Sequence, residues 1–483
     1  MTLSTVQPGS DDDGAVIPPG AGGSGPPVRH PASFRDPGGF VFLRDGILYR
    51  QVNHVFRAEW KSVVETGLLR RWQDDGRYIG HDDVEVGLAA DPKIAYAVLR
   101  PKPVGFVSYP YEWTFGELRD AALLTLDLQD DAQRHGFTLR DASAYNIQFD
   151  SGRPVLIDSL SVAPLERDAP WAAYRQFCQH FIAPLALMAH RDVRCGLMLR
   201  DHADGIPLDL ASALLPGRTY LSPGLAAHIH LHARSQRRLS NATPVPRHTP
   251  SLGATRRAAL IDSLRRTVQG LRWNPDRTEW ADYDRQTSYS DEGARAKESI
   301  VGTMLRDTDG SVVWDLGANI GRFSAIAARL GRRVVAWDSD PGASERHYRA
   351  LRKAGEARIL PLVQDITNPS PGLGWGGAAR AAFVDRSNAD VVLALALVHH
   401  LAIGKNVPLD SVASLFARLA PRAIVEFVPK EDPMVGRMLA SRRDIFADYT
   451  RNGFERAFEA RYRILERQPI QDSTRMLYRL ERR

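Results

Sequence analysis

Apolar and polar positions follow two different patterns along the chain, and the pattern changes near residue 256. Beyond that point, short apolar runs alternate with amphipathic helical stretches such as 322–330 and 342–354. The strand-like runs cover residues 311–316, 333–337, 359–363, 390–398 and 422–428. This alternation predicts a mostly parallel sheet with helices on both faces. Two further runs, 461–465 and 475–480, have no long helix between them and predict a final antiparallel strand.

The first half of the chain has a mixed pattern. Residues 1–33 are rich in Gly, Pro, Ser and Asp and predict a disordered tail. Residues 34–232 combine strand-like runs at 39–43 and 96–99 with amphipathic stretches at 117–135 and 171–190, which predicts an α+β domain. Residues 233–256 are polar, basic and contain proline, so we expect a linker there. The alternating α/β domain then occupies 257–483.

Composition narrows the classes of partner. The chain has 483 residues, and its 63 basic residues are interspersed with 57 acidic ones, which argues against a nucleic-acid partner. Cys178 and Cys195 fit no zinc-binding spacing. The longest apolar stretch, 181–189, is too short to span a membrane. No charged start followed by an apolar run marks a secretion signal, so we expect a cytoplasmic protein.

The segment 312–324, VVWDLGANIGRFS, combines a strand, a glycine turn and the start of a helix. Glycine is needed where the backbone turns sharply or a ligand lies against it. Ligands of open α/β sheets bind at the carboxyl ends of the strands, and a helix N-terminus attracts an anionic group. The candidate cofactor-binding residues of this turn are Asp315, Gly317, Asn319 and Gly321. Their spacing differs from the G-x-G-x-x-G fingerprint of dinucleotide-binding proteins.

Polar residues also follow the next three strands in the same order. Asp338 comes 21 residues after Gly317, where a carboxylate can accept hydrogen bonds from ribose hydroxyls. Asp340 is the alternative for that role. Asp365 follows the third strand, at the place expected to meet an adenine amino group. An Asp at a strand end is often only a helix cap, so the argument rests on all of these positions occurring in register.

On these residues the region from about Trp273 onward resembles class I S-adenosylmethionine-dependent methyltransferases. The resemblance is greatest to a bacterial group related to nodulation proteins. The stretches that carry it are WDLGANIGRFS, VVAWDSDP, LALALVHHLAIGKNVPL, AIVEFVPKEDPMV and FADYTRNGFE. It implies a seven-stranded doubly wound sheet whose last strand is antiparallel, with S-adenosyl-L-methionine as the cofactor. Asn319 stands where many relatives have glycine.

Methyl transfer is mostly a matter of alignment, with a general base for a hydroxyl or ammonium acceptor. His399 and His400 follow the fourth strand and Glu426 ends the fifth, so all three are candidate catalytic residues. We take His400 as the better candidate. The acceptor itself is left open among a small molecule, a glycan and a lipid.

A segment rich in Tyr, Trp and charged residues precedes the glycine turn. Tyr283, Tyr289 and Lys297 are candidates for a lid over the cofactor, and Tyr289 in particular is a candidate cofactor-binding residue. The aromatic face of a tyrosine attracts a sulfonium through the cation–π interaction. Ordinary packing of these side chains is the alternative.

Residues 135–160 resemble the catalytic segment of protein kinases. Asp141 and Asn146 are five residues apart, and a strand-like run ends near Asp158. In kinases one carboxylate orients the substrate hydroxyl, while the Asn and the second Asp hold magnesium. Asn146 and Asp158 are therefore metal-ligand candidates if this site is active, and no other metal site is expected.

The upstream lobe matches kinases less well. FVSYPYEW at 106–113 takes the place of an inter-lobe hinge, Arg50 that of the usual strand lysine, and Glu59 that of its helix partner. There is no glycine-rich phosphate loop, and IDSL replaces the Asp-Phe-Gly motif. Three interpretations stay open: a kinase-like domain that binds the acceptor or regulates the enzyme, an active small-molecule kinase, and coincidental spacing. A non-catalytic cofactor-binding protein is a further alternative for the whole chain.

Overall fold

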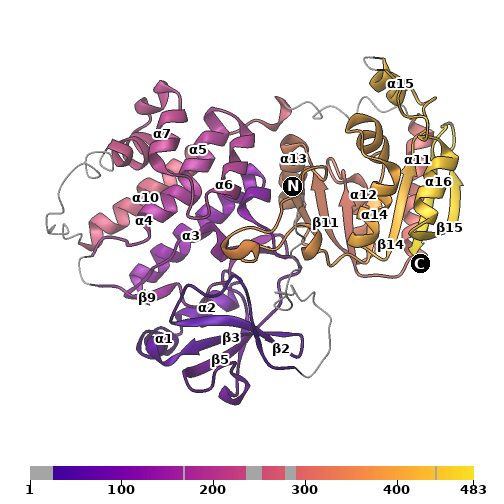
Figure 1. The fold of residues 1–483 in the computed structure, drawn as a ribbon. Helices are drawn as coiled ribbons and strands as arrows, with labels where there is room; N and C mark the ends of the chain where they lie inside the picture. Colours follow the sequence, from indigo (N-terminus) through magenta and orange to yellow (C-terminus); the bar gives the residue numbers. More distant parts are fainter. Residues whose placement is uncertain (1–24, 167–168, 235–252, 278–289, 441–442) are drawn as a thin grey trace, which may run out of the picture.

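A computed structural model describes residues 25–166, 169–234, 253–277, 290–440 and 443–483. Two domains lie side by side (Figure 1): an N-terminal domain of two lobes and a C-terminal α/β domain. In the described ranges, no helix is both long enough and apolar enough to cross a bilayer.

The first lobe of the N-terminal domain is an antiparallel sheet with the order β1-β2-β3-β5-β4. Its strands and the helices beside it are β1 (Val28–Arg29), β2 (Gly39–Arg44), β3 (Ile47–Asn53), α1 (Arg57–Glu65), α2 (Leu68–Asp74), β4 (His81–Val84) and β5 (Ala95–Pro101). Residues 28–29 were predicted to lie in a disordered tail. They instead pair with β2, because Val28 and Arg29 lie opposite Leu43 and Phe42.

The second lobe is mainly helical and is built around the long helix α3 (Phe115–Arg134). Thr114 caps α3, since its hydroxyl accepts the backbone N–H of Glu117 at 3.2 Å. Two short antiparallel pairs follow: β6 (Phe137–Leu139) with β9 (Val162–Pro164), and the hairpin of β7 (Ile147–Asp150) with β8 (Arg153–Leu156). Further helices complete the lobe: α4 (Tyr174–Phe177), α5 (Ala183–His190), α6 (Met198–Asp201), α7 (Leu208–Leu214), α8 (Pro223–Leu225) and α10 (Ala254–Gly270). A strand lobe followed by a helical lobe is the arrangement of a kinase-like fold.

Helix α10 corrects the predicted domain boundary. We expected the C-terminal domain to start at residue 257, but α10 packs on the N-terminal domain. Its apolar side chains at Ile261, Leu264 and Val268 are buried there, and Arg265 pairs with Asp127 of α3. The N-terminal domain therefore extends to Gly270. The amphipathic pattern predicts the helix, but it does not indicate the domain on which the helix packs.

The C-terminal domain is a seven-stranded sheet with the order β12-β11-β10-β13-β14-β16-β15. The strands are β10 (Val312–Leu316), β11 (Arg333–Asp338), β12 (Ile359–Val363), β13 (Val391–Ala394), β14 (Arg422–Phe427), β15 (Tyr462–Pro469) and β16 (Met476–Arg482). All neighbouring pairs are parallel except those that β16 makes with β14 and β15. This confirms the predicted doubly wound sheet with one antiparallel strand, which is the class I methyltransferase topology.

The fourth strand is shorter than predicted. Hydrophobic residues continue to 398, but β13 ends at Ala394. Ala396 then adopts a left-handed conformation with φ of 52°, and a π-helical turn covers His400–Gly404. The backbone therefore leaves the sheet before the two histidines.

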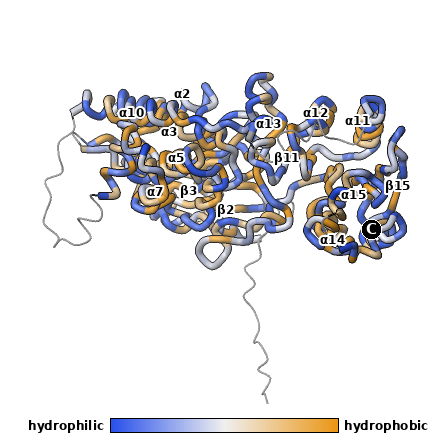
Figure 2. Tube along the Cα trace, turned by 90° about the horizontal axis from the view of Figure 1, so that it is seen from above, coloured by the Kyte–Doolittle hydropathy of each residue, from blue (hydrophilic) through white to orange (hydrophobic). Residues whose placement is uncertain are grey.

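Helices cover both faces of the C-terminal sheet. Figure 2 shows α11 (Asp291–Arg306), α12 (Arg322–Arg329) and α13 (Pro341–Ala354) along one side, with α14 (Leu409–Leu419) on the other. The remaining helices are α15 (Pro433–Leu439) and α16 (Arg451–Glu459). Val313 and Val334 face α11 and α12 in one core, whereas the side chains of Trp314 and Trp337 enter a second core.

The second core is shared with the N-terminal domain. Phe106, from the segment after β5, lies edge-on against both Trp314 and Trp337, with ring centroids 5.5 and 5.6 Å away. Close by, the guanidinium of Arg386 is ion-paired with Glu112, and both side chains are buried. The segment predicted as an inter-lobe hinge thus also joins the two domains.

Helices α3 and α13 make a second contact across the same interface. The backbone N–H of Gly116 donates to the Glu345 carboxylate at 2.7 Å, and the Tyr348 hydroxyl donates to Asp120 at 2.6 Å. A Cβ at Gly116 would lie 2.7 Å from the Tyr348 ring, so glycine permits this close approach.

Candidate functional site

The glycine turn after β10 is tied to the neighbouring strand β11. The backbone N–H groups of Gly317 and Ala318 both donate to the carbonyl of Trp337, at 2.8 and 3.0 Å. Gly317 has φ of 77° and Asn319 has φ of 49°. Left-handed backbone is unfavourable for most residues, but asparagine tolerates it, which explains the replacement of glycine at position 319. The turn thus holds a fixed shape at the carboxyl edge of the sheet.

Gly321 is required for two reasons. Its φ is 84°, and a Cβ at this position would overlap the imidazole of His347. His347 lies on α13 and is buried, and burial lowers the pKa of its imidazole to about 4. The neutral imidazole of His347 therefore packs against the turn at Gly321, the residue before α12 begins at Arg322.

Asp315 lies beneath the turn and is almost fully buried. Its carboxylate accepts the Ser324 hydroxyl at 2.6 Å. Burial raises the pKa of Asp315 to about 6, and the hydrogen bond from Ser324 opposes that rise. The side chain connects the end of β10 to the first turn of α12.

Asp338 ends β11 directly beside the glycine turn. One carboxylate oxygen accepts the backbone N–H of Asn319 at 2.7 Å, and the other accepts that of Asp340 at 2.8 Å. Burial raises the pKa of Asp338 to about 6, and these backbone hydrogen bonds oppose the rise. Asp340, the alternative to Asp338, instead caps α13 by accepting the N–H of Gly342 at 2.6 Å.

Asp365 lies two residues beyond β12. One of its carboxylate oxygens accepts both the backbone N–H of Thr367, at 2.9 Å, and the Thr367 hydroxyl, at 2.7 Å. The side chain therefore shapes a local turn at the same edge of the sheet. Its predicted contact with an adenine amino group stays a prediction.

His399 and His400 follow β13, with ring centroids 4.2 Å apart. His399 is fully buried, and neither of its ring nitrogens has a hydrogen-bond partner among the described residues. Burial lowers the pKa of both rings, to about 4 for His400, and the positive charge of Arg475 adds to the effect. His400 is half-buried, so it is the more accessible of the two.

Glu426 lies at the centre of a buried charge network. It pairs with Lys297 at 2.6 Å and with Arg475 at 3.3 Å, and Arg475 also pairs with Asp432 at 2.7 Å. Glu426 further accepts the backbone N–H of Ala396 at 2.8 Å, and this fixes the turn that leads to the histidines. The network thus ties α11, β14 and the end of β13 together.

The prediction that Lys297 belongs to a lid is wrong. Lys297 is 5% exposed on α11, and its ammonium lies 4.8 Å from the centre of the Phe323 ring. Burial lowers the pKa of Lys297, and Glu426 opposes that shift. The other two lid candidates, Tyr283 and Tyr289, lie outside the described residues.

A second polar cluster lies in the N-terminal domain. Arg50 of β3 forms an ion pair with Asp158 at 2.6 Å, and both side chains are less than one-fifth exposed. Burial raises the pKa of Asp141, and the Asp158 carboxylate adds to the rise, whereas Asn146 opposes it. Asp158 and Asn146 therefore both influence Asp141, and a metal-binding role for Asn146 and Asp158 stays a prediction.

The partner expected for Arg50 was different. Glu59 lies on α1, and no ion pair joins it to Arg50 within the ranges that the structure describes. Asp158 takes that place, so the carboxylate assigned to a metal ion is neutralised by an arginine. This pairing links the two lobes of the domain.

The sequence patterns did not predict two buried residues of the site. His347 and Arg475 are buried and reach the site from α13 and from the start of β16. His347 lies on the buried face of its helix, which is a detectable signal for packing but not for contact with a glycine turn. Arg475 carries no local signal, because its partners Glu426 and Asp432 are more than 40 residues away.

Comparison with solved structures finds proteins that resemble part of this chain. No protein-family model matches the chain. A crystal structure of WbdD is 19% identical over 42% of this chain and 42% of its own length, with a TM-score of 0.28, so the match spans about two fifths of WbdD. Magnesium protoporphyrin IX methyltransferase from Synechocystis PCC 6803, with bound SAM, is 15% identical over 43% of this chain and 93% of its own (TM-score 0.30). The N-methyltransferase NodS from Bradyrhizobium japonicum WM9 is 12% identical over 40% and 98%, with a TM-score of 0.30.

One curated protein matches almost end to end. Nodulation protein NoeA of Rhizobium meliloti (strain 1021) is 35% identical over 467 residues, which cover 94% of this chain and 96% of the relative. The match therefore extends over the sequence of both domains. The chain belongs to the NoeA family of nodulation proteins.

Proposed function

We propose that the protein transfers a methyl group from S-adenosyl-L-methionine to an acceptor whose class is open. The observation that carries this proposal is the position of Asp338, whose carboxylate touches the glycine turn at the carboxyl edge of a class I methyltransferase sheet. A glycine turn, a strand-end carboxylate and a helix N-terminus meet there in the order that a nucleoside-type cofactor requires.

The residues of the turn suit that cofactor. Gly317 and Gly321 have φ of 77° and 84°, and a Cβ at Gly321 would overlap His347, so glycine lets the turn adopt the shape that we assign to cofactor binding. Asp338 and Asn319 would hold the ribose, and Asp315 supports the turn below them. Asp365 remains our candidate for the adenine amino group. When bound, S-adenosylmethionine supplies a methyl group on an electrophilic sulfonium.

We assign proton removal from the acceptor to His400. Burial lowers the pKa of His400 to about 4, so the imidazole is neutral and can accept a proton, but as a weaker base than an unperturbed histidine. In this proposal His399 and Glu426 act as positioning residues. His399 packs against the His400 ring, and Glu426 fixes the turn that carries both rings.

The proposal does not specify the acceptor of the methyl group. Small metabolites, glycans and lipids all include molecules with hydroxyl or amine groups that can be methylated. The name of the relative refers to nodulation, and it does not specify an acceptor. A search among these classes therefore needs the full chain and an unbiased readout.

The first test is calorimetry of the full chain with S-adenosylhomocysteine. We expect saturable binding, and absence of heat would contradict the proposal.

The second test follows transfer of a radiolabelled methyl group from S-adenosylmethionine to fractionated bacterial metabolites. Cofactor binding without transfer in any fraction would favour the non-catalytic alternative. Full turnover by both His400→Ala and His399→Ala would contradict the assignment of the base.

A second candidate function is phosphotransfer by the N-terminal domain. It is favoured by the proximity of Asp141, Asn146 and Asp158 and opposed by the Arg50–Asp158 ion pair. Incubation with labelled ATP and magnesium distinguishes the two, with Asp158→Ala as the control. Label transfer that Asp158→Ala abolishes would establish the bifunctional alternative.

A further inference from the structure

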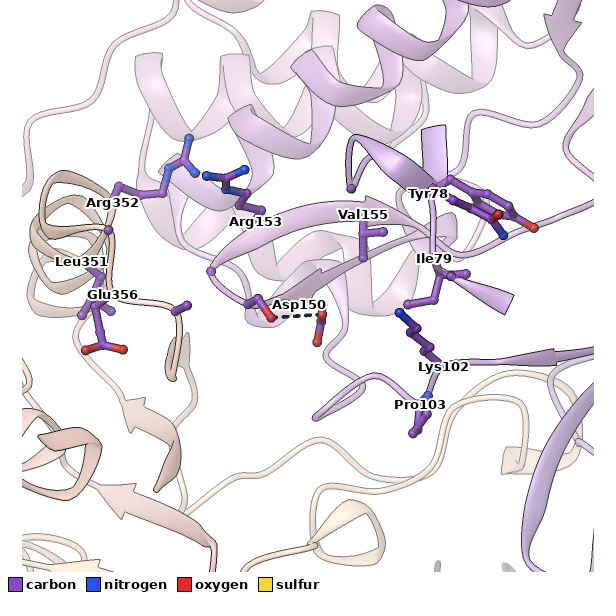
Figure 3. Close-up of a pocket in the computed structure, with 17 residues that line it drawn as sticks. Tyr78, Ile79, Lys102, Pro103, Asp150, Arg153, Val155, Leu351, Arg352 and Glu356 are labelled. Carbon is purple, nitrogen blue, oxygen red and sulfur yellow. Dashed lines mark hydrogen bonds between the residues drawn. The ribbon is translucent and has the colours of Figure 1, made fainter. Parts of the chain in front are cut away.

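A cavity of about 550 Å³ lies between the two domains, and its lining includes neither Asp338 nor Asp158. Its N-terminal wall includes the turn before β4, Lys102 after β5, and the tip of the β7–β8 hairpin. Its C-terminal wall is the last turn of α13 and the segment that follows it, with Arg352 and Glu356 (Figure 3). Its volume falls in the range of about 300–1,000 Å³ typical of small-molecule sites.

The hairpin tip closes the cavity from one side. Ser151 and Gly152 have φ of 49° and 72°, which makes a tight two-residue turn between β7 and β8. A Cβ at Gly152 would lie 3.0 Å from the carbonyl oxygen of Glu356. Glycine therefore lets the hairpin approach the other domain closely, and the cavity is a built feature of the interface.

Three cations from three separate elements line this cavity: Lys102, Arg153 and Arg352. Figure 3 shows the side chains of Arg153 and Arg352 extending toward one another from the two domains. Arg352 lies 3.4 Å from Asp120, whereas Lys102 and Arg153 have no carboxylate within 4.0 Å among the described residues. Like charges that converge repel each other unless an anion lies between them.

Lys102 is held over the cavity by packing. Its side chain crosses Gly80, where a Cβ would lie 3.1 to 3.4 Å from the last three atoms of the lysine. The backbone N–H of Lys102 also donates to the Gly80 carbonyl at 2.7 Å. The absence of a side chain at position 80 thus gives the lysine its path toward the cavity.

The remaining polar groups suit hydroxyls. Asp150 and Glu356 line the cavity. Asp150 accepts the Ser151 hydroxyl at 3.2 Å and Glu356 accepts the backbone N–H of Arg358 at 2.8 Å, and each carboxylate has further acceptor sites for hydroxyl groups. Among the described residues that line it, the aromatic ring is that of Tyr78, which is 1% exposed and offers no face for stacking a base. A ligand with both an anionic group and several hydroxyls matches these walls better than a nucleotide.

We propose that this cavity binds a small phosphorylated polyol of monosaccharide size. The anionic group lies among Lys102, Arg153 and Arg352, and the hydroxyls face Asp150 and Glu356. Such a ligand contacts both domains and stabilises their docked arrangement by mass action. The same helix, α13, starts beside Asp338 and ends at the cavity, so one rigid element joins the two sites. This inference does not depend on the proposed methyl transfer.

The test is calorimetry of the full chain with glucose 6-phosphate, with glucose, inorganic phosphate and ATP as separate titrants. We expect saturable heat with glucose 6-phosphate and at least about tenfold weaker binding, or none, of the other three. Arg153→Ala and Lys102→Ala are expected to weaken glucose 6-phosphate binding by at least about tenfold each, as loss of a charge-assisted contact implies. Both side chains are exposed, so folding is preserved, which an unchanged melting temperature verifies.

Lys353→Ala is the matched control, because Lys353 is the exposed neighbour of Arg352 on α13 and does not line the cavity. Unchanged binding in this control, together with the losses above, supports the proposal. Absence of heat with glucose 6-phosphate overturns it, and so do affinities that neither Arg153→Ala nor Lys102→Ala changes. ATP or inorganic phosphate binding as tightly as glucose 6-phosphate overturns the assignment of the ligand class.

Discussion

The two domains carry two polar centres that look alike in the sequence and differ in structure. At the edge of the C-terminal sheet, Asp338 is held by the backbone N–H groups of Asn319 and Asp340, beside a turn that glycine shapes. In the N-terminal domain, Asp158 is held by the guanidinium of Arg50. Backbone donors fix a carboxylate without neutralising its charge, whereas an arginine supplies a full opposite charge. In our proposal the first centre receives the neutral ribose of the cofactor, whereas the second has its charge already balanced by Arg50.

The two domains nevertheless form one unit. Aromatic and charged contacts join the domains through Phe106, Glu112 and Tyr348. The shared hydrophobic core extends from the helical lobe to Trp314 and Trp337. Phe383 of the C-terminal domain packs against both tryptophans, and Phe106 adds a contact to the same two rings from the N-terminal domain. The aromatic cluster is therefore built from both domains.

The largest expected effect is on this shared core. Phe106→Ala should lower the free energy of unfolding by about 3–5 kcal/mol, because the substitution leaves a cavity between two tryptophan rings. Thermal unfolding followed by calorimetry measures the loss. Phe34→Ala is the control, since Phe34 is 38% exposed and its loss should cost much less. If Phe106→Ala behaved like the control, the domains would not share a core.

The next effect concerns the glycine turn. Gly321→Ala should weaken S-adenosylhomocysteine binding by at least about 100-fold, because left-handed strain of about 1–2 kcal/mol adds to the overlap with His347. Gly331→Ala is the matched control. Gly331 has nearly the same φ, 83°, but a Cβ added there would have no atom within 4 Å, so this variant introduces the backbone strain without the overlap. Equal affinities in the two variants would contradict the role of the turn.

A smaller effect is expected at Asp338. Asp338→Asn should weaken S-adenosylhomocysteine binding by about tenfold, since an amide is a poorer acceptor for two ribose hydroxyls. Calorimetric titration of the variant measures the loss.

The pH dependence of S-adenosylhomocysteine binding by the wild type gives an independent measurement. The pKa of Asp338 is about 6, and the ionised form binds, so the affinity of the wild type should fall as the pH drops through 6 and level off above it. A wild-type profile that stays flat between pH 5 and about 7 would contradict this assignment.

The smallest effect sharpens the comparison between the two centres. A double-mutant cycle of Arg50→Ala and Asp158→Ala should give a coupling energy of about 1 kcal/mol, because the pair is mostly buried and each partner compensates the other. Chemical denaturation of the four proteins measures it. Additive losses would mean that Asp158 is free of Arg50 in solution and open to a metal ion.

Local patterns were sufficient for much of the C-terminal domain. The glycine turn, the carboxylate of Asp338 and the order of strands and helices all follow from short segments whose chemistry is complete within a few residues. The same holds for the spacing of Asp141 and Asn146. These features depend on backbone conformation and strand direction, which neighbouring residues largely determine.

The tertiary structure decided which groups meet across the chain. It placed α10 on the N-terminal domain, buried Lys297 against Glu426, paired Arg50 with Asp158 and brought His347 beneath Gly321. Each of these contacts joins residues that are far apart in sequence, and each depends on which faces pack together. Amphipathic patterns specify that a face is buried, but the partner is chosen by the packing of the whole molecule.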